Sequence, residues 1–236
     1  MFNFVFYAWS TVLVVGALPI ALVSGAAMRR VSWFWGWTCL AMLRVLVGLR
    51  HRIRGREHVP AGPVIAAVKH QSAWDILVVS LLLPNAIIVA KRELSWIPVF
   101  GYELRRAGHI FIDRGGGAKE LKRLVDWAQA RVAAGLSVVV FPQGTRTLPG
   151  TPYPYQPGIA ALYVALGLPV VPVALNSGLF WPRRRPLQRP GMVTVEFLPP
   201  IPPGHRRRRF MTELEDAIET ATARLEAEAR AEHDLG

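Results

Sequence analysis

The sequence predicts an α/β protein in which helices flank a central, largely parallel or mixed β-sheet. Between residues 60 and 200, short apolar runs alternate with helical patterns, and this alternation is typical of a parallel sheet. Ahead of it, residues 1–49 form two apolar segments that carry only three charged side chains. We therefore expect two parts: a membrane-associated helix pair over residues 1–49, and an α/β domain with a C-terminal amphipathic helix over residues 50–236.

The first apolar segment, residues 1–28, has no charged side chain and is longer than the roughly 20 residues that a membrane-spanning helix needs. Arg29 and Arg30 follow directly, which by the positive-inside tendency places the following domain on the cytoplasmic face of the inner membrane. The second segment, residues 31–49, is rich in tryptophan, which favours the membrane interface. The pair either spans the membrane or dips into one leaflet. The alternative is two core helices of a soluble bundle.

The chain carries a formal net charge of +12, unevenly distributed. Residues 1–212 contain 26 Lys and Arg against 8 Asp and Glu, whereas residues 213–236 contain 2 against 8. Strongly basic chains bind nucleic acid, anionic membrane surfaces or phosphorylated substrates. We find no zinc-ligand spacing, RNA-binding signature or recognition helix, so we expect membrane phospholipid as a partner, no nucleic acid and no metal. The single cysteine, Cys39, excludes an internal disulfide.

Each predicted strand of the α/β domain is a short apolar run bounded by Gly, Pro or polar residues. A turn containing Pro98 and Gly101 connects the second run to the third. Pro172 lacks a backbone donor, so its strand is expected at a sheet edge or at a bulge. The predicted strands cover residues 64–68, 86–90, 109–112, 137–141, 170–175 and 192–198.

The helices between these strands are predicted from apolar residues that recur at helical spacing. The clearest of them, residues 118–134, stops at Gly135. The C-terminal helix has the same spacing, and Thr212-x-x-Glu215 is its expected cap. The other predicted helices cover residues 72–83 and 158–166.

His70 lies on the predicted turn between the first strand of the domain and a helix that begins at Ser72, and Asp75 falls in the first turn of that helix. Five positions along an uninterrupted helix would separate two side chains by about 140°, but a turn lets them meet. A histidine with a carboxylate on one ring nitrogen is a general base held in one tautomer. A second hypothesis is a capping box, Ser72-x-x-Asp75, in which Asp75 serves only the helix N-terminus.

Cationic side chains follow three further predicted strands: Lys91, Arg114 and Arg146. In an open α/β sheet, the loops at the strand ends converge on one edge, where ligands bind. We therefore expect these three side chains to gather around one site with His70.

The chain resembles the glycerolipid acyltransferases, and most closely the 1-acyl-sn-glycerol-3-phosphate acyltransferases, over most of residues 50–200. His70-x-x-x-x-Asp75 matches the first motif, which is the catalytic pair in that family. The third motif departs from the family at Gln143, where a glutamate is usual, so a role for an anion there is in doubt. The remaining similar segments are Lys91–Leu94 with Ile97–Gly101, Gly108–Arg114 (second motif), Phe141–Arg146 (third motif) and Val171–Val173 (fourth motif).

The resemblance implies transfer of a fatty acyl group to the sn-2 hydroxyl of 1-acyl-glycerol-3-phosphate (lysophosphatidic acid), giving phosphatidic acid in phospholipid biosynthesis. Acyl-CoA or acyl carrier protein would be the co-substrate, and no cofactor is expected. His70 would remove the hydroxyl proton while Asp75 orients the ring. No acyl-enzyme is expected, because no serine or cysteine has the setting of a nucleophile.

The remaining candidate residues would bind substrate. Backbone N–H groups of Gly144 and Thr145 are candidates for holding the tetrahedral oxyanion. By charge-assisted hydrogen bonds, the acceptor phosphate would be held by Lys91, Arg114 and Arg146.

Two other hypotheses compete with this one. The first is an acyltransferase of the same family that uses another acceptor, such as a lyso-ornithine lipid or glycerol 3-phosphate. The second is a non-catalytic membrane protein that binds anionic lipid through its basic face. The acyl donor, the preferred chain length and the oligomeric state are left open by the sequence.

Overall fold

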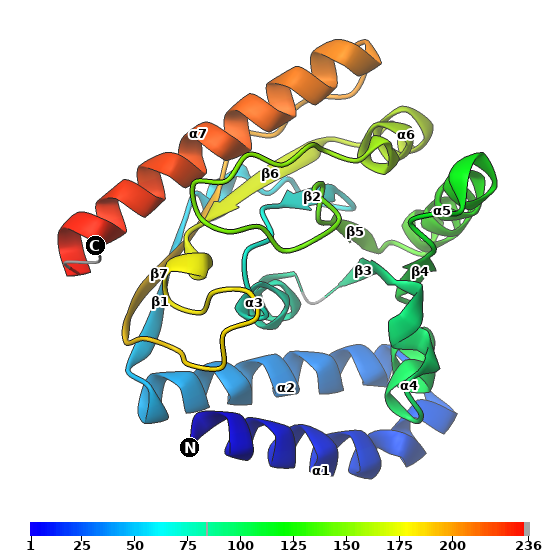
Figure 1. The fold of residues 1–236 in the computed structure, drawn as a ribbon. Coiled ribbons are helices and arrows are strands. Elements are labelled where there is room, and N and C mark those ends of the chain that lie inside the picture. Colours follow the sequence, from blue (N-terminus) through cyan, green and yellow to red (C-terminus); the bar gives the residue numbers. More distant parts are fainter. Residues whose placement is uncertain (84, 234–236) are drawn as a thin grey trace.

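The computed structural model describes residues 1–83 and 85–233, and its centre is a seven-stranded sheet (Figure 1). The strand order is β1-β7-β6-β2-β5-β3-β4. Every neighbouring pair is parallel except β6 and β7, which confirms the predicted largely parallel sheet. The strands are β1 (Leu49–Arg54), β2 (Ile65–Val68), β3 (Ala86–Lys91), β4 (Ile110–Ile112), β5 (Ser137–Val140), β6 (Val170–Leu175) and β7 (Gly191–Phe197).

Helices cover both faces of the sheet (Figure 1). Alternate residues of β2 enter opposite cores: Ala66 and Val68 pack with the α3 side, whereas Ile65 and Ala67 pack with α5, α6 and α7. All four residues are buried, as expected for a parallel strand covered on both faces. The helices are α1 (Phe2–Val23), α2 (Gly25–Leu46), α3 (Trp74–Leu82), α4 (Phe100–Ala107), α5 (Gly117–Ala133), α6 (Pro157–Leu166) and α7 (Arg207–His233).

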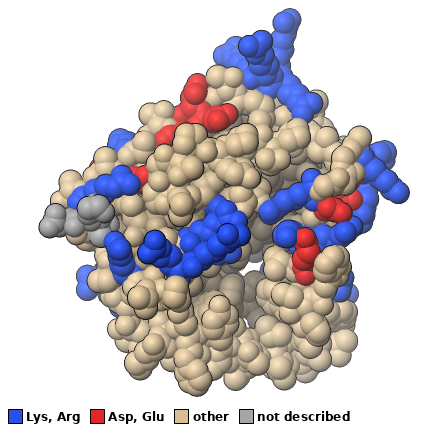
Figure 2. Space-filling model, in the orientation of Figure 1, with Lys and Arg blue, Asp and Glu red and all other residues tan. Residues whose placement is uncertain are grey.

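The N-terminal helices α1 and α2 lie side by side beneath α3 (Figure 1). Helix α2 is part of the protein core, because Cys39 and Leu43 are fully buried in the same cluster as α3. Helix α1 is on the outside. It is the one described helix that is long and apolar enough to cross a membrane. Only 11% of its most apolar 18-residue segment is buried. Figure 2 shows this lower part of the molecule almost free of charged side chains.

Both ends of α1 are attached to the α/β domain. At the N-terminal end, the Phe2 ring packs edge-on against Trp181, and Asn3 donates a hydrogen bond to the Pro186 carbonyl. At the C-terminal end, Arg106 Nε donates to the Ala21 carbonyl at 2.6 Å. The two attachment points, Phe2 and Ala21, are 19 residues apart on the helix, a distance of about 28 Å.

The turn expected around Pro98 and Gly101 is present at Pro98 and Val99, but Gly101 lies in helix α4, which was not expected. The helix begins after Val99, whose φ is +59°, and it is only eight residues long, which gives a weak periodic signal. Gly101 fits where no larger residue would, since a Cβ there would lie 2.4 Å from the Ser95 carbonyl oxygen. Burial raises the pKa of Glu103 to about 7, so α4 packs a carboxyl that is neutral in mildly acidic solution.

The N-terminal cap expected at Thr212 for the C-terminal helix was also wrong, because α7 begins at Arg207. Arginine is a good helix former, and the basic run at residues 206–209 continues into the helix. Phe210 is fully buried and anchors this first turn to the core. Thr212 is therefore an interior residue of the helix.

Pro172 does not mark a sheet edge, because β6 lies between β7 and β2. The proline is accommodated because it faces the end of the antiparallel ladder. Its carbonyl accepts a hydrogen bond from Leu198 N at 2.9 Å, and the strand pairing with β7 begins only at Val173. The strand therefore lacks one backbone hydrogen bond at Pro172, while β6 stays inside the sheet between β7 and β2.

The basic stretch that follows the helix pair, residues 50–56, supplies most of edge strand β1, which pairs in parallel with β7. Two of its arginines contact carboxylates of the acidic α7: Arg54 with Glu228 at 2.7 Å and Arg52 with Glu232 at 3.8 Å. The opposite charges of the two chain regions are therefore partly matched within the molecule.

Candidate active site

The strand-to-helix turn after β2 brings the imidazole of His70 and the carboxylate of Asp75 together. His70 Nδ1 lies 2.8 Å from Asp75 Oδ2. The same oxygen accepts hydrogen bonds from the backbone N–H groups of Gln71 at 2.7 Å and Ser72 at 2.8 Å. The other oxygen, Oδ1, accepts one from the Ser177 hydroxyl at 2.5 Å. Asp75 thus holds the ring and caps the turn at once, so the geometry of both hypotheses is present.

Helix α3 begins at Trp74, two residues later than expected, so the proposed start at Ser72 was wrong. Ser72 still serves this end of the helix, because its hydroxyl accepts a hydrogen bond from Trp74 N at 3.1 Å. The two extra residues lengthen the turn between β2 and α3. This leaves room for the His70 side chain to fold back onto Asp75.

The hydrogen bond to Asp75 fixes which ring nitrogen of His70 is free. An ionised carboxylate only accepts, so Nδ1 carries the proton and Nε2 keeps a lone pair. Nε2 has no hydrogen-bond partner among the described residues. The ring stacks on Phe141 with centroids 4.1 Å apart. With 11% of the His70 side chain exposed and none of Asp75, the pair is a sheltered base that a substrate can still reach.

The third-motif loop lies directly against this base. Thr147 N donates to the His70 carbonyl at 2.9 Å. Gly144 makes the tight turn with a φ of +68°, and its own N–H donates to the Phe141 carbonyl at 2.8 Å. That N–H is therefore already used within the turn. The N–H of Thr145 donates to no group in the described part of the chain.

Arg114 reaches the same loop from the end of β4. A Cβ placed on Gly144 would lie 3.8 Å from Arg114 Nε, so the second and third motifs meet, although they are 30 residues apart in the sequence. The guanidinium is on the surface. The expected approach of Arg114 to the site loop is therefore present in the structure.

Lys91 and Arg146 lie at the rim. Lys91 is half-exposed and pairs with Glu93 at 2.8 Å. Its strand, β3, is separated from β2 by β5, which puts the two strand ends about 10 Å apart at the usual strand spacing. Arg146 is on the third-motif loop, where its carbonyl accepts a hydrogen bond from Arg183. Among the described residues, neither cation forms a hydrogen bond or an ion pair with His70.

Several residues of the site could not be found from the sequence. Ser177 is fully buried and holds Asp75, yet a serine after a strand carries no distinguishing signal. Lys69 is 2% exposed, and its ammonium group contacts both oxygens of Glu219 on α7, at 2.8 and 2.6 Å. Since α7 is 150 residues away in the sequence, no local pattern predicts this contact.

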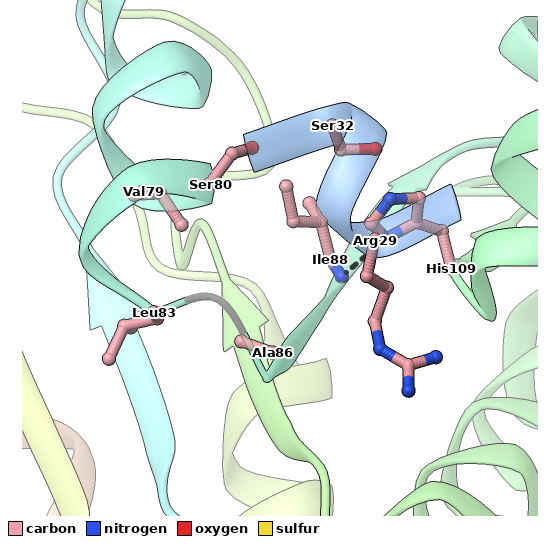
Figure 3. A pocket seen from close by; sticks show the side chains of 8 residues that line it. All are labelled: Arg29, Ser32, Val79, Ser80, Leu83, Ala86, Ile88 and His109. Atoms are coloured by element: carbon pink, nitrogen blue, oxygen red, sulfur yellow. Dashed lines mark hydrogen bonds between the residues drawn. The ribbon is translucent and has the colours of Figure 1, made fainter. Parts of the chain in front are cut away.

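A small cavity between α2, α3 and β3 lies apart from this site. His109 borders it (Figure 3) and accepts a hydrogen bond on Nδ1 from Ile88 N at 3.0 Å. Burial lowers the pKa of His109 to about 4, so its ring is neutral near pH 7. The cavity volume of about 10 Å³ is space for about one water molecule. Within the second motif, His109 therefore has a structural role, because its ring binds the backbone of strand β3.

Among the described residues, no group of three or more His, Cys, Asp or Glu side chains could hold a metal ion. The chemistry that this arrangement supports is proton removal by His70 Nε2 from a polar group brought to the third-motif loop. An alcohol next to an anionic group fits the surroundings, because Arg114 approaches Gly144 of this loop and Arg146 is part of it.

Comparison with known proteins agrees with this chemistry. A model of the acyltransferase family matches residues 50–176. The chain is 32% identical to the 1-acyl-sn-glycerol-3-phosphate acyltransferase of Pseudomonas aeruginosa, over 94% of this chain and 86% of the relative. It is 32% identical to the human 1-acyl-sn-glycerol-3-phosphate acyltransferase alpha, over 85% of this chain and 72% of the relative. The chain therefore belongs to the acyltransferase family and is an enzyme of that class.

A solved structure confirms the fold. The crystal structure of the 1-acyl-sn-glycerophosphate acyltransferase from Thermotoga maritima superposes with a TM-score of 0.78. The match covers 96% of this chain and 95% of that chain, at 21% sequence identity. The two N-terminal helices and the α/β domain therefore recur together in a second protein.

Asp75→Asn separates orientation of the base from helix capping. Asparagine caps a helix nearly as well as aspartate, but it lacks the negative charge that stabilises an imidazolium ion. We expect kcat for acyl transfer to fall roughly 100-fold or more, with the melting temperature nearly unchanged. Steady-state kinetics and thermal melts check this. Asp126→Asn, the same change at an exposed α5 carboxylate that pairs with Lys122, is the control. Full activity of Asp75→Asn would mean that Asp75 only caps.

Proposed function

We propose that this enzyme transfers a fatty acyl group from a thioester to the sn-2 hydroxyl of 1-acyl-glycerol-3-phosphate, giving phosphatidic acid. The observation that carries the proposal is the free Nε2 of His70, held by Asp75 at the edge of a loop bordered by cations. The relatives with the highest similarity given above are named for this reaction. The phosphate of that acceptor suits the positive charge at the site.

The reaction needs one proton carrier. His70 Nε2 takes the hydroxyl proton as the alcohol oxygen attacks the thioester carbonyl, forming the new C–O bond and a tetrahedral oxyanion. When the oxyanion collapses, the C–S bond breaks, and the imidazolium returns the proton to the leaving thiolate. Asp75 keeps Nδ1–H in place throughout and stabilises the cationic ring. No acyl-enzyme forms, since Cys39 is fully buried in the helix layer and the Ser72 hydroxyl is used by the helix start.

The oxyanion requires donors that are aimed before the reaction begins. Of the two backbone groups considered, Gly144 N–H donates within its own turn. Thr145 N–H is therefore the better donor, and Gly144 contributes by giving the loop its left-handed backbone.

The acceptor phosphate binds to the cations on the rim. Arg114 is placed best, because its side chain extends over Gly144 and guanidinium groups bind phosphate by two parallel hydrogen bonds. Lys91 and Arg146 border the same edge and complete a positively charged entrance. Acyl-CoA and acyl carrier protein both supply the required thioester, and neither reaction partner calls for a further cofactor.

The attachments of α1 support membrane binding through one leaflet. A helix that crosses the bilayer has its ends on opposite sides of a hydrocarbon core about 30 Å thick. Here one domain contacts both ends, through Trp181 and Arg106. The outward side of α1 exposes Phe4, Tyr7 and Val15. The helix therefore inserts sideways, and the site faces the cytoplasmic leaflet that supplies the lysolipid.

His70→Ala tests the proposed reaction. The purified wild-type protein in lipid or detergent should acylate 1-acyl-glycerol-3-phosphate with acyl-CoA, acyl carrier protein thioester or both. His70→Ala should lower kcat by roughly 100- to 10,000-fold while sedimentation with anionic vesicles is unchanged. Assays with lyso-ornithine lipid and glycerol 3-phosphate run in parallel. Transfer to one of those acceptors alone would contradict the acceptor, and an unimpaired alanine variant would contradict the mechanism.

The one-leaflet arrangement predicts where the ends of α1 are accessible. A single cysteine, either inserted directly after Met1 or introduced as Val23→Cys, is placed in a protein whose buried Cys39 is replaced by alanine. At both positions it should react with a membrane-impermeant maleimide from the cytoplasmic side. Labelling of inside-out and right-side-out vesicles measures this. Reaction of the two positions from opposite sides would show that α1 crosses the membrane.

A further inference from the structure

The two residues that flank His70 are both tied to the C-terminal helix. Lys69 contacts both carboxylate oxygens of Glu219, at 2.8 and 2.6 Å, and Gln71 Nε2 donates to Glu226 Oε1 at 2.6 Å. The two glutamates are seven residues apart on α7, so they lie two turns apart on the same face. The backbone is thereby held by α7 on either side of the base.

Glu219 also reaches His70 by a second route. Its Oε1 accepts hydrogen bonds from Gln143 Nε2 at 3.2 Å and from the Tyr155 hydroxyl at 2.8 Å. Burial raises the pKa of Tyr155, so the phenol keeps its proton and donates. The carbonyl oxygen of Gln143 in turn accepts from the backbone N–H of His70 at 3.4 Å.

These contacts indicate that Glu219 does more than neutralise the charge of Lys69. Lys69 is 2% exposed, and an ammonium group that deep is costly unless it is paired, so the pair by itself contributes little to stability. What the contacts provide is a fixed geometry, because one carboxylate joins the His70 turn, the third-motif loop and α7. Helix α7 lies outside residues 50–176, the part that matches the family model.

We propose that Glu219 is a positioning residue for His70, acting through Lys69 and Gln143 to fix the turn from which the imidazole reaches the acceptor hydroxyl. This rests on the proposed acyl transfer, in which a displaced base lowers the rate. Glu219 does not touch substrate. Its loss should therefore lower kcat and leave the KM for the acceptor nearly unchanged.

The experiment is an exchange of the two partners. Glu219→Gln removes the carboxylate from buried Lys69, and Gln143→Glu puts a second carboxylate beside the first, where the amide now lies at 3.2 Å. Each change alone should lower kcat roughly 10- to 100-fold. The double variant again has one carboxylate and one amide in the cluster, so its kcat should return to within about threefold of wild type.

The matched control is Glu213→Gln, the same change on the same helix at a half-exposed carboxylate that pairs with Arg209. It should keep wild-type kcat. Thermal melts are recorded for all variants. If Glu219→Gln does not fold, Glu219→Asp is used, which keeps the charge but withdraws it by one methylene; the proposal then requires a kcat loss of at least about threefold with an unchanged KM.

Three results would overturn the proposal. They are wild-type kcat in Glu219→Gln (or in Glu219→Asp, where that variant is used), a kcat loss no greater than that of Glu213→Gln, and a double variant whose fold-loss in kcat is the product of the two single fold-losses. A wild-type protein that transfers no acyl group would instead overturn the proposed function, and the two failures are therefore distinguishable.

Discussion

The structure depends on the carboxylate of Asp75, which lies just after buried strand β2 and both orients the catalytic base and caps the turn. Asp75 Oδ2 holds the imidazole of His70 and also accepts two backbone N–H groups of the turn. Those N–H groups belong to a completely buried stretch, where an unpaired donor would cost about 1–3 kcal/mol each. The fold therefore needs the aspartate in the place where the chemistry needs it, and the base is oriented before any substrate arrives.

The sheet topology determines what surrounds that carboxylate. Strand β2 lies between β6 and β5, so the loops after those two strands are its immediate neighbours. The loop after β6 supplies Ser177 to Asp75, and the loop after β5 supplies Phe141 and Thr147 to His70. Strands β3 and β4 follow β5 in the sheet, so they lie two and three positions from β2. Lys91 lies at the end of β3, and Arg114, after β4, reaches back to Gly144 of the third-motif loop.

Much of this arrangement could be predicted from local sequence. The alternation of apolar runs and helical patterns gave the parallel sheet, and the turn between β2 and α3 allowed His70 and Asp75 to meet. Two local predictions failed. The eight-residue α4 is too short for a periodic signal. Pro172 was expected at a sheet edge or a bulge, because its missing backbone donor was considered without its position in the hydrogen-bond ladder. The expected starts of α3 and α7 each missed by a few residues, since caps are set by hydrogen bonds that form only in the fold.

The contacts that escaped prediction are those between segments far apart in the chain. Nothing near Lys69 indicates that its partner is Glu219, 150 residues later, and the spacing of the C-terminal helix did not show which segments its carboxylates contact. In the structure its carboxylates pair with the site turn and with edge strand β1. Gln143, the one departure from the expected third motif, is part of the same cluster and bridges Glu219 to the His70 backbone.

The central claim is that the free nitrogen of His70 takes the proton from an acceptor hydroxyl. The most direct measurement is a crystal structure of the wild-type protein with 1-acyl-glycerol-3-phosphate bound and no acyl donor present. The account predicts the sn-2 oxygen within roughly 2.6–3.2 Å of His70 Nε2, with the phosphate on Arg114. A bound acceptor whose hydroxyl lies more than about 5 Å from Nε2, beyond the reach of one hydrogen bond, would contradict it.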